Sequence, residues 1–129
     1  MKVLALDYGR ARTGVAVSDA TGTLARPLEV IERVRSGPGM RLLLDRIDAE
    51  QPELVVVGLP LTLRGEPGEQ ARETLAFVEQ LRARCPVPVD TYDERFTTTL
   101  AERGGSSRHG ADALAAAHLL EGYLTRLAG

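Results

Sequence analysis

Three acidic positions lie where predicted secondary structure elements begin or end. Asp7 follows a short apolar run, Asp93 and Glu94 follow another, and Asp112 opens the last predicted helix. If the first and last strands lie near each other in a sheet, these carboxylates converge at one edge and repel one another. A hard divalent cation such as Mg²⁺ or Mn²⁺ relieves that repulsion, because it prefers oxygen ligands and keeps water in its open positions.

Two such ions about 4 Å apart can activate a water and stabilise the leaving oxygen of a phosphodiester. A hydrolase site of this kind requires no His, Ser or Cys. Each acid also has a purely structural explanation: Asp112 could stabilise a helix N-terminus, Asp93 could fix a turn, and Glu94 could pair with Arg95. Asp7 is the hardest to explain in that way, since a strand end before a glycine has little local use for a charge.

Hydrophobic periodicity predicts the elements that must position these acids. Strands are predicted at residues 2–6, 13–18, 24–31, 53–58 and 87–92. A first helix is predicted from Met40, Leu43, Leu44 and Ile47, entered through residues 36–39, and a second from Ala71, Leu75, Val78 and Leu81. A short helix is expected at residues 97–103, a mobile loop at 104–110, and a final helix at 111–127 with Ala113, Ala117, Leu120, Leu124 and Leu127 on one face.

This order of elements predicts an α/β fold. The first three strands, joined by tight connections, favour an antiparallel meander, and the later strands alternate with helices. We therefore expect a mixed five-stranded sheet flanked by helices, in a single domain spanning residues 1–129. Sites in such sheets form where strands end, because loops there gather polar groups over a rigid floor.

Length and composition agree with one intracellular domain. The chain has 129 residues, 43% of them hydrophobic, which is enough to close a single core. No apolar run approaches the roughly 20 residues that span a bilayer, and the N-terminus reaches an aspartate too early for a signal peptide. We expect a soluble, cytoplasmic protein without a membrane partner, and the single Cys85 is interpreted as a small packing residue.

The charges are unevenly distributed. The net charge of −2 counts against tight, nonspecific binding of nucleic acid by the whole chain. Residues 1–46 carry a net +3, residues 47–102 a net −6, and residues 103–129 a net +1. Fifteen of the 16 cations are arginine, which binds phosphate through a planar fork, although a compositional bias of the genome explains that count equally well.

Four segments of the chain resemble, in order and over nearly its whole length, the conserved blocks of the YqgF family, also called RuvX. They are LALDYGRARTGVAVSD, VVVGLPLTLRGEPGEQA, TYDERFTT and ADALAAAHLLEGYL. The resemblance implies a ribonuclease H-like fold and a metal-dependent nuclease. It implies that Asp7, Glu94 and Asp112 are the catalytic carboxylates and bind two Mg²⁺ or Mn²⁺ ions, and it favours Glu94 over Asp93.

The same resemblance suggests two substrates. The family is assigned to maturation of the 5′ end of pre-16S ribosomal RNA and, by fold similarity, to cleavage of four-way DNA (Holliday) junctions. The chain departs from the family pattern after DER, where family members usually have a longer stretch that often carries a lysine. Arg108 could replace that lysine at a phosphate, and His109 could orient a water or be an ordinary solvated histidine.

Several residues near the predicted site are candidates for contact with nucleic acid. Aromatic residues there could stack on bases or belong to the core; they are Tyr8, Tyr92 and Phe96. Backbone contacts are predicted for a turn glycine and four arginines, all of which could equally be ordinary turn or surface residues: Gly9, Arg10, Arg12, Arg95 and Arg108.

The leading hypothesis is a nuclease for structured RNA or branched DNA. One alternative is a nucleotide-binding switch, because an aspartate-glycine turn also opens the actin and sugar-kinase domain, but that fold needs two such domains. Another is a nucleic-acid-binding or assembly factor without turnover, which the presence of all three acids disfavours. Junction resolution would require two sites related by a two-fold axis, hence a homodimer.

Overall fold

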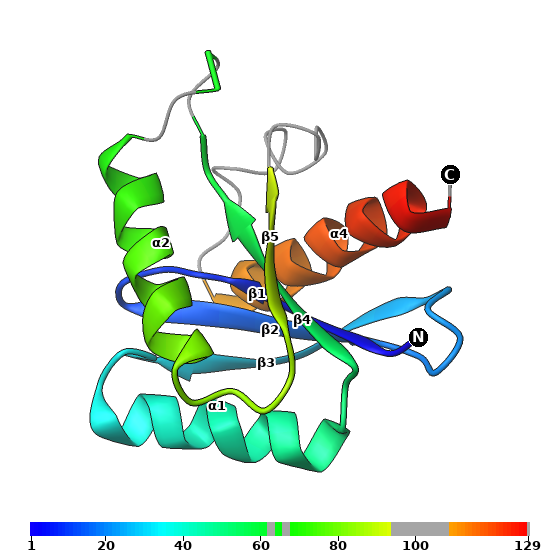
Figure 1. Ribbon diagram of the computed structural model, residues 1–129, viewed down its shortest axis with the longest axis horizontal. Coiled ribbons are helices and arrows are strands. Elements are labelled where there is room, and N and C mark those ends of the chain that lie inside the picture. Colours follow the sequence, from blue (N-terminus) through cyan, green and yellow to red (C-terminus); the bar gives the residue numbers. More distant parts are fainter. Residues whose placement is uncertain (62–63, 66–67, 94–108, 129) are drawn as a thin grey trace.

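Figure 1 shows the computed structural model, which describes residues 1–61, 64–65, 68–93 and 109–128, the first four residues of the last range by their main chain only. The elements are β1 (Val3–Asp7), β2 (Arg12–Ser18), β3 (Ala25–Glu32), α1 (Gly37–Glu50), β4 (Leu54–Leu59), α2 (Glu69–Arg82), β5 (Val89–Asp93) and α4 (His109–Ala128). The helix predicted at residues 97–103 lies outside the described residues, as does most of the predicted loop at 104–110.

The five strands form one mixed sheet in the order β3-β2-β1-β4-β5. Strands β1, β2 and β3 pair antiparallel, which confirms the predicted meander. Strand β4 pairs parallel with β1 on one side and with β5 on the other. The carboxyl ends of β1, β4 and β5 therefore lie at the same edge of the sheet, and the first acidic position, Asp7, is at that edge.

Helices cover both faces of the sheet, as Figure 1 shows: α1 and α2 pack on one face and α4 on the other. The buried side chains accordingly form two clusters. The cluster under α1 and α2 contains Leu4, Leu6, Tyr8, Val15, Ile31, Val34, Met40, Leu43, Ile47, Val55, Val57, Phe77, Val78, Leu81 and Val89. The cluster under α4 contains Val3, Ala5, Ala16, Val56, Tyr92, Ala116, Ala117, Leu119, Leu120, Tyr123 and Leu124.

Helix α1 begins and ends where local chemistry favours a boundary. The Ser36 hydroxyl accepts a hydrogen bond from the Gly39 backbone N–H at 3.0 Å, and Pro38 stands in the first turn, where its missing N–H costs nothing. The helix ends at Gln51, which adopts a left-handed conformation with φ of 53°. Its buried face contains Met40, Leu43 and Ile47, as the spacing predicts.

Two residues on the predicted apolar helix faces are exposed. Leu75 of α2 is 38% exposed, and Thr74 is buried instead. A hydroxyl can be buried there because Thr74 donates a hydrogen bond to the Gln70 carbonyl at 2.9 Å. Leu127 is 52% exposed because the last turn of α4 extends beyond the sheet-facing stripe, which ends at Leu124.

Of the predicted boundaries that the structure describes, two shift by two residues, and the others by one residue at most. Strand β5 begins at Val89 rather than at residue 87, because Pro88 has no N–H to donate to the ladder. Helix α4 begins at His109 rather than at residue 111, so His109 and Gly110 belong to the helix and not to a loop. Among the described residues, no helix is both long and apolar enough to cross a membrane.

Candidate active site

Asp7 is the last residue of β1, half-buried at the rim of the core. It pairs with Gly14 of the neighbouring antiparallel strand β2. Side chains alternate between the two faces of a strand. Because Leu6 and Tyr8 belong to the cluster under α1 and α2, Asp7 projects toward the α4 face, as Val3 and Ala5 do.

The neighbouring parallel strands end at the same level. Leu6 is in register with Val57, so Asp7 lies level with Gly58, and Gly58 is in register with Tyr92. Position 58 faces α4 because Val56 does. Gly58 is buried and carries no side chain on that face, between the positions of Asp7 and Tyr92.

Strand alternation separates the two acids that the sequence left open at the end of β5. Tyr92 packs in the cluster under α4, so Asp93 projects toward the opposite face of the sheet from Asp7. Asp93 is half-buried and pairs in register with Leu59. Glu94 lies outside the described residues.

The first turn of α4 is directed toward the Asp7 end of β1. The last turns of α4 lie at the other end, where Leu124 and Leu127 line a hollow with Met1 and Gly22. The helix thus runs opposite to β1 (Figure 1). The main chain places Asp112 as the fourth residue of α4, and in the described part of the chain no group of three His, Cys, Asp or Glu side chains could hold a metal ion.

The turn after Asp7 is tightly closed. A Cβ on Gly9 would overlap the carbonyl oxygen of Arg12, so the turn itself requires glycine. The buried Thr13 hydroxyl donates to the Gly9 carbonyl at 3.3 Å and accepts from its N–H at 3.4 Å. This pair of bonds fixes the turn relative to β2.

Arg10 projects from this turn and is anchored by helix α2. Its Nε donates to Glu73 Oε2 at 2.8 Å, while 79% of the Arg10 side chain stays exposed. The hydrogen bond and the negative charge of Glu73 raise the pKa of Arg10. Sequence reasoning missed Glu73, because nothing local signals a partner 63 positions away. The second arginine of this turn, Arg12, is half-buried as the first residue of β2 and pairs in register with Glu32 of β3.

Two of the aromatic residues considered for base stacking belong to the core. Tyr8 is 8% exposed and stacks on Phe77, with ring centroids 4.8 Å apart. Tyr92 is also 8% exposed and meets Tyr123 edge to face at 5.6 Å. The stacking hypothesis is therefore wrong for both residues, and Phe96 lies outside the described residues.

The remaining candidates can be located only in part. Arg95 and Arg108 lie outside the described residues, and His109 is the first residue of α4.

Cys85 packs against the core under α1 and α2, and burial raises the pKa of its thiol. This confirms Cys85 as a packing residue, since a raised pKa disfavours the thiolate that a nucleophile needs.

Comparison with known proteins provides independent information. A family model described as "RuvX: Holliday junction resolvase" matches residues 1–126. A Desulforudis audaxviator protein, provisionally named a pre-16S rRNA nuclease, is 42% identical over 132 residues, covering 96% of this chain and 94% of its own. A Rubrobacter xylanophilus protein of the same provisional name is 47% identical over 130 residues, covering 95% and 91%.

Solved structures with the same arrangement of strands and helices are Holliday junction resolvases. Thermus thermophilus RuvC in complex with a Holliday junction substrate has a TM-score of 0.63 at 23% identity, covering 100% of this chain and 97% of its own. The Fowlpox virus resolvase in complex with junction DNA has a TM-score of 0.59 at 11% identity, covering 100% of both chains. These likenesses confirm the predicted ribonuclease H-like fold.

Proposed function

The chain belongs to the RuvX family, and from this membership we propose that it is a divalent-metal-dependent nuclease that matures the 5′ end of pre-16S ribosomal RNA. The observation that carries the proposal is Asp7, a half-buried carboxylate at the end of a buried strand, on the edge where three parallel strands end. Relatives that match almost the whole chain are named for the same activity. The reaction is hydrolysis of a phosphodiester bond, and a precursor of ribosomal RNA as substrate places it in the cytoplasm.

Asp7, Glu94 and Asp112 would hold Mg²⁺ or Mn²⁺. The described part of the site fits such ions, because Asp7 offers hard oxygen ligands from a rigid strand and no side chain projects from the neighbouring position 58. Strand alternation directs Asp93 to the other face, which supports Glu94 rather than Asp93 as the second ligand. Bound metal would supply an activated water and charge stabilisation at the phosphate.

The protein's own groups position the substrate. Burial of Leu6 and Tyr8 on either side of Asp7 keeps that carboxylate at a fixed place. Arg10, held by Glu73, presents its guanidinium at the turn, and Arg12 lies beside it at the start of β2. We assign both arginines to the phosphate backbone, with Gly9, Arg95 and Arg108 as further predicted contacts.

Cleavage of four-way DNA junctions is the second candidate. It is favoured by the family description and by the fold shared with resolvases. Two symmetric cuts would require two copies of the chain about a two-fold axis. The protein would then be a homodimer, whereas processing of one RNA strand makes no such demand.

The test is direct comparison of substrates. Purified protein is incubated with a pre-16S 5′ precursor RNA, a matched single strand and a four-way DNA junction, each with Mg²⁺, Mn²⁺ or EDTA. We expect metal-dependent cleavage of the precursor at a defined position. Preferential cutting of the junction would favour the second candidate, and binding without cleavage of any substrate would favour a non-catalytic assembly factor.

A further inference from the structure

The loop between β3 and α1, residues 33–36, lies directly beside the turn between β1 and β2. The Arg33 backbone N–H donates to the Ala11 carbonyl oxygen at 3.0 Å. Next to this bond, Arg12 of β2 is in register with Glu32 of β3. Both connections therefore belong to the sheet edge that carries Asp7.

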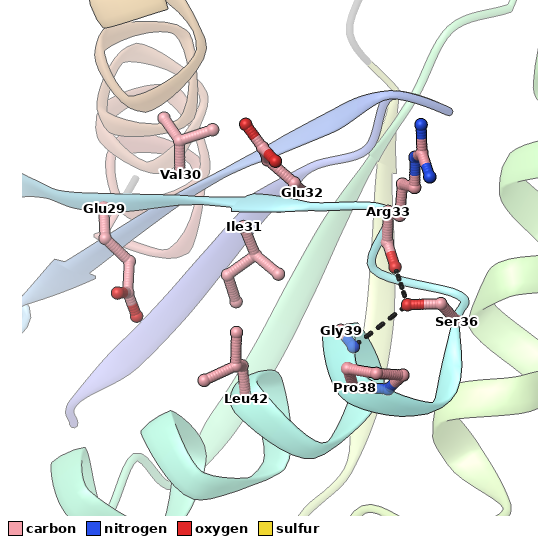
Figure 2. Close-up of a pocket in the computed structure, with 9 residues that line it drawn as sticks. All are labelled: Glu29, Val30, Ile31, Glu32, Arg33, Ser36, Pro38, Gly39 and Leu42. Carbon is pink, nitrogen blue, oxygen red and sulfur yellow. Dashed lines mark hydrogen bonds between the residues drawn. The ribbon is translucent and has the colours of Figure 1, made fainter.

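The backbone of Arg33 is held in a conformation that residues with a side chain rarely adopt. Its φ is 46°, in the left-handed region, where the Cβ makes the conformation costly. The Arg33 carbonyl accepts hydrogen bonds from the Ser36 N–H at 2.9 Å and the Ser36 hydroxyl at 2.7 Å. Figure 2 shows the Arg33 side chain directed away from Ser36 and α1. The loop thus fixes an exposed arginine at the surface.

Helix α2 orients two further arginines on this edge. Glu73 accepts from Arg10 Nε at 2.8 Å, and Gln80 accepts from Arg35 Nε at 2.8 Å. Gln80 also donates to the Arg35 carbonyl at 3.2 Å. The two acceptors lie about two helical turns apart on α2. In both pairs Nε donates the hydrogen bond, and each exposed guanidinium carries further N–H donors on its terminal nitrogens.

We infer that Arg33 and Arg35 form a second phosphate-binding element, which continues the arginine turn of Arg10 and Arg12 along the sheet edge. Planar guanidinium groups match the oxygens of a phosphodiester backbone, the chemistry shared by RNA and DNA. A backbone bound at Asp7 would run over the ends of β2 and β3 toward the start of α1. The inference rests on the proposed function only in placing the reacting phosphate at Asp7.

The test compares two double variants in an Asp7→Asn background, which prevents cleavage during the measurement. Arg33→Gln with Arg35→Gln removes the proposed element. Arg26→Gln with Arg126→Gln removes two exposed arginines from the opposite end of the sheet, where β3 begins and α4 ends. Fluorescence anisotropy gives the Kd for a labelled RNA hairpin and a labelled four-way DNA junction at several salt concentrations.

Removal of the proposed element should weaken binding and reduce the slope of log Kd against log salt by about 2, roughly one for each lost phosphate contact. The control pair should leave both quantities at the values of the Asp7→Asn protein. A charge-retaining pair, Arg33→Lys with Arg35→Lys, should keep most of the slope and excludes a general loss of folding. A weaker Kd for the hairpin alone would identify RNA as the nucleic acid that this element binds, and a weaker Kd for the junction alone would identify DNA.

Equal Kd values and slopes for the two glutamine pairs would overturn the inference, as would failure of the Asp7→Asn protein to bind either probe. These outcomes are separate from the proposed function. A wild-type protein that shows no metal-dependent cleavage, while the glutamine pair at Arg33 and Arg35 still loses binding, contradicts the nuclease and leaves the binding surface in place.

Discussion

At the residue scale, the most informative position is the carboxylate of Asp7 at the end of β1. Asp7 ends a strand whose residues Val3 to Leu6 are fully buried. Charged groups at the rim of a core are retained when they bind something or are paired. Asp19 is a second acid next to a strand end, and its carboxylate is committed to the turn that contains it.

Asp19 closes the turn between β2 and β3. Its oxygens accept hydrogen bonds from the Thr23 N–H at 2.8 Å, the Thr21 hydroxyl at 2.8 Å and the Leu24 N–H at 3.2 Å. These bonds, the one from Thr23 first, hold the pKa of Asp19 below its ordinary value of 3.8. The charged form therefore stabilises the folded state above that ordinary value, and the contribution is lost as pH falls through the lowered pKa.

We accordingly expect Asp19→Asn to lower the melting temperature at neutral pH. The difference from the wild-type protein should hold from neutral pH to about pH 4 and shrink as pH falls below the ordinary value of 3.8, because protonation of the carboxylate then removes its contribution. Thermal denaturation of both proteins at several pH values measures this difference in melting temperature. A difference that is constant over the whole range would show that the charge of Asp19 does not stabilise the turn.

At the element scale, the start of α1 is fitted closely against the end of β3. A Cβ added to Gly39 would overlap the Arg33 carbonyl oxygen, which also accepts two hydrogen bonds from Ser36. By contrast, a Cβ added to Gly37 would meet nothing within 4 Å. The two glycines thus form a matched pair on one helix.

Gly39→Ala should destabilise the protein by about 1–3 kcal/mol, the usual range for overpacking a closely fitted position. Gly37→Ala should be neutral or slightly stabilising, since alanine restricts the unfolded chain more than glycine does. Urea denaturation of both variants provides the comparison. Equal stability of the two variants would contradict the close contact between α1 and Arg33.

The positions of strands and helices could be predicted from the sequence where the local hydrophobic pattern determines them. The meander and the central parallel strand follow from short apolar runs, and α1 follows from its stripe and from Ser36. Leu75 and Leu127 were misassigned because helical spacing defines a stripe but not its width or its end. The Arg10–Glu73 and Arg33–Ala11 contacts could not be predicted, since they depend on how separate loops meet.

At the scale of the whole molecule, the sheet lies between two hydrophobic cores. The predicted site lies at the edge of the sheet where β1, β4 and β5 end. Phe77 is fully buried and joins α2 to β1 by stacking on Tyr8, the residue after Asp7. Loss of this ring would weaken the packing of the helix layer and the support under the Asp7 strand together.

Phe77→Ala should lower the free energy of unfolding by roughly 3–5 kcal/mol, as for other large-to-small changes of buried aromatic residues. Leu75→Ala, two positions away on the same helix and 38% exposed, should cost much less. Chemical denaturation measures the free energy of unfolding of both variants. Similar losses for the two variants would contradict the packing of α2 described here.

The site as a whole was predicted from single acids joined by a family resemblance. The sequence could indicate that Asp7 ends a strand, and sheet topology then places it on the edge shared by β4 and β5. Spacing and periodicity could not choose between Asp93 and Glu94, because the choice depends on which face each side chain takes, and only the family resemblance favoured Glu94. Strand alternation, fixed by buried Tyr92, directs Asp93 away from Asp7.

The most direct test of the central claim is metal-dependent cleavage of a pre-16S 5′ precursor RNA by the wild-type, Asp7→Asn and Asp45→Asn proteins. Asp45 is an exposed residue of α1 and provides a matched change of charge. We expect Asp7→Asn to reduce the rate by on the order of a hundredfold or more, since even residues that only support metal ligands cost about 10–100-fold. Asp45→Asn should cleave at the wild-type rate, and cleavage at that rate by a folded Asp7→Asn protein would contradict the assignment of the site.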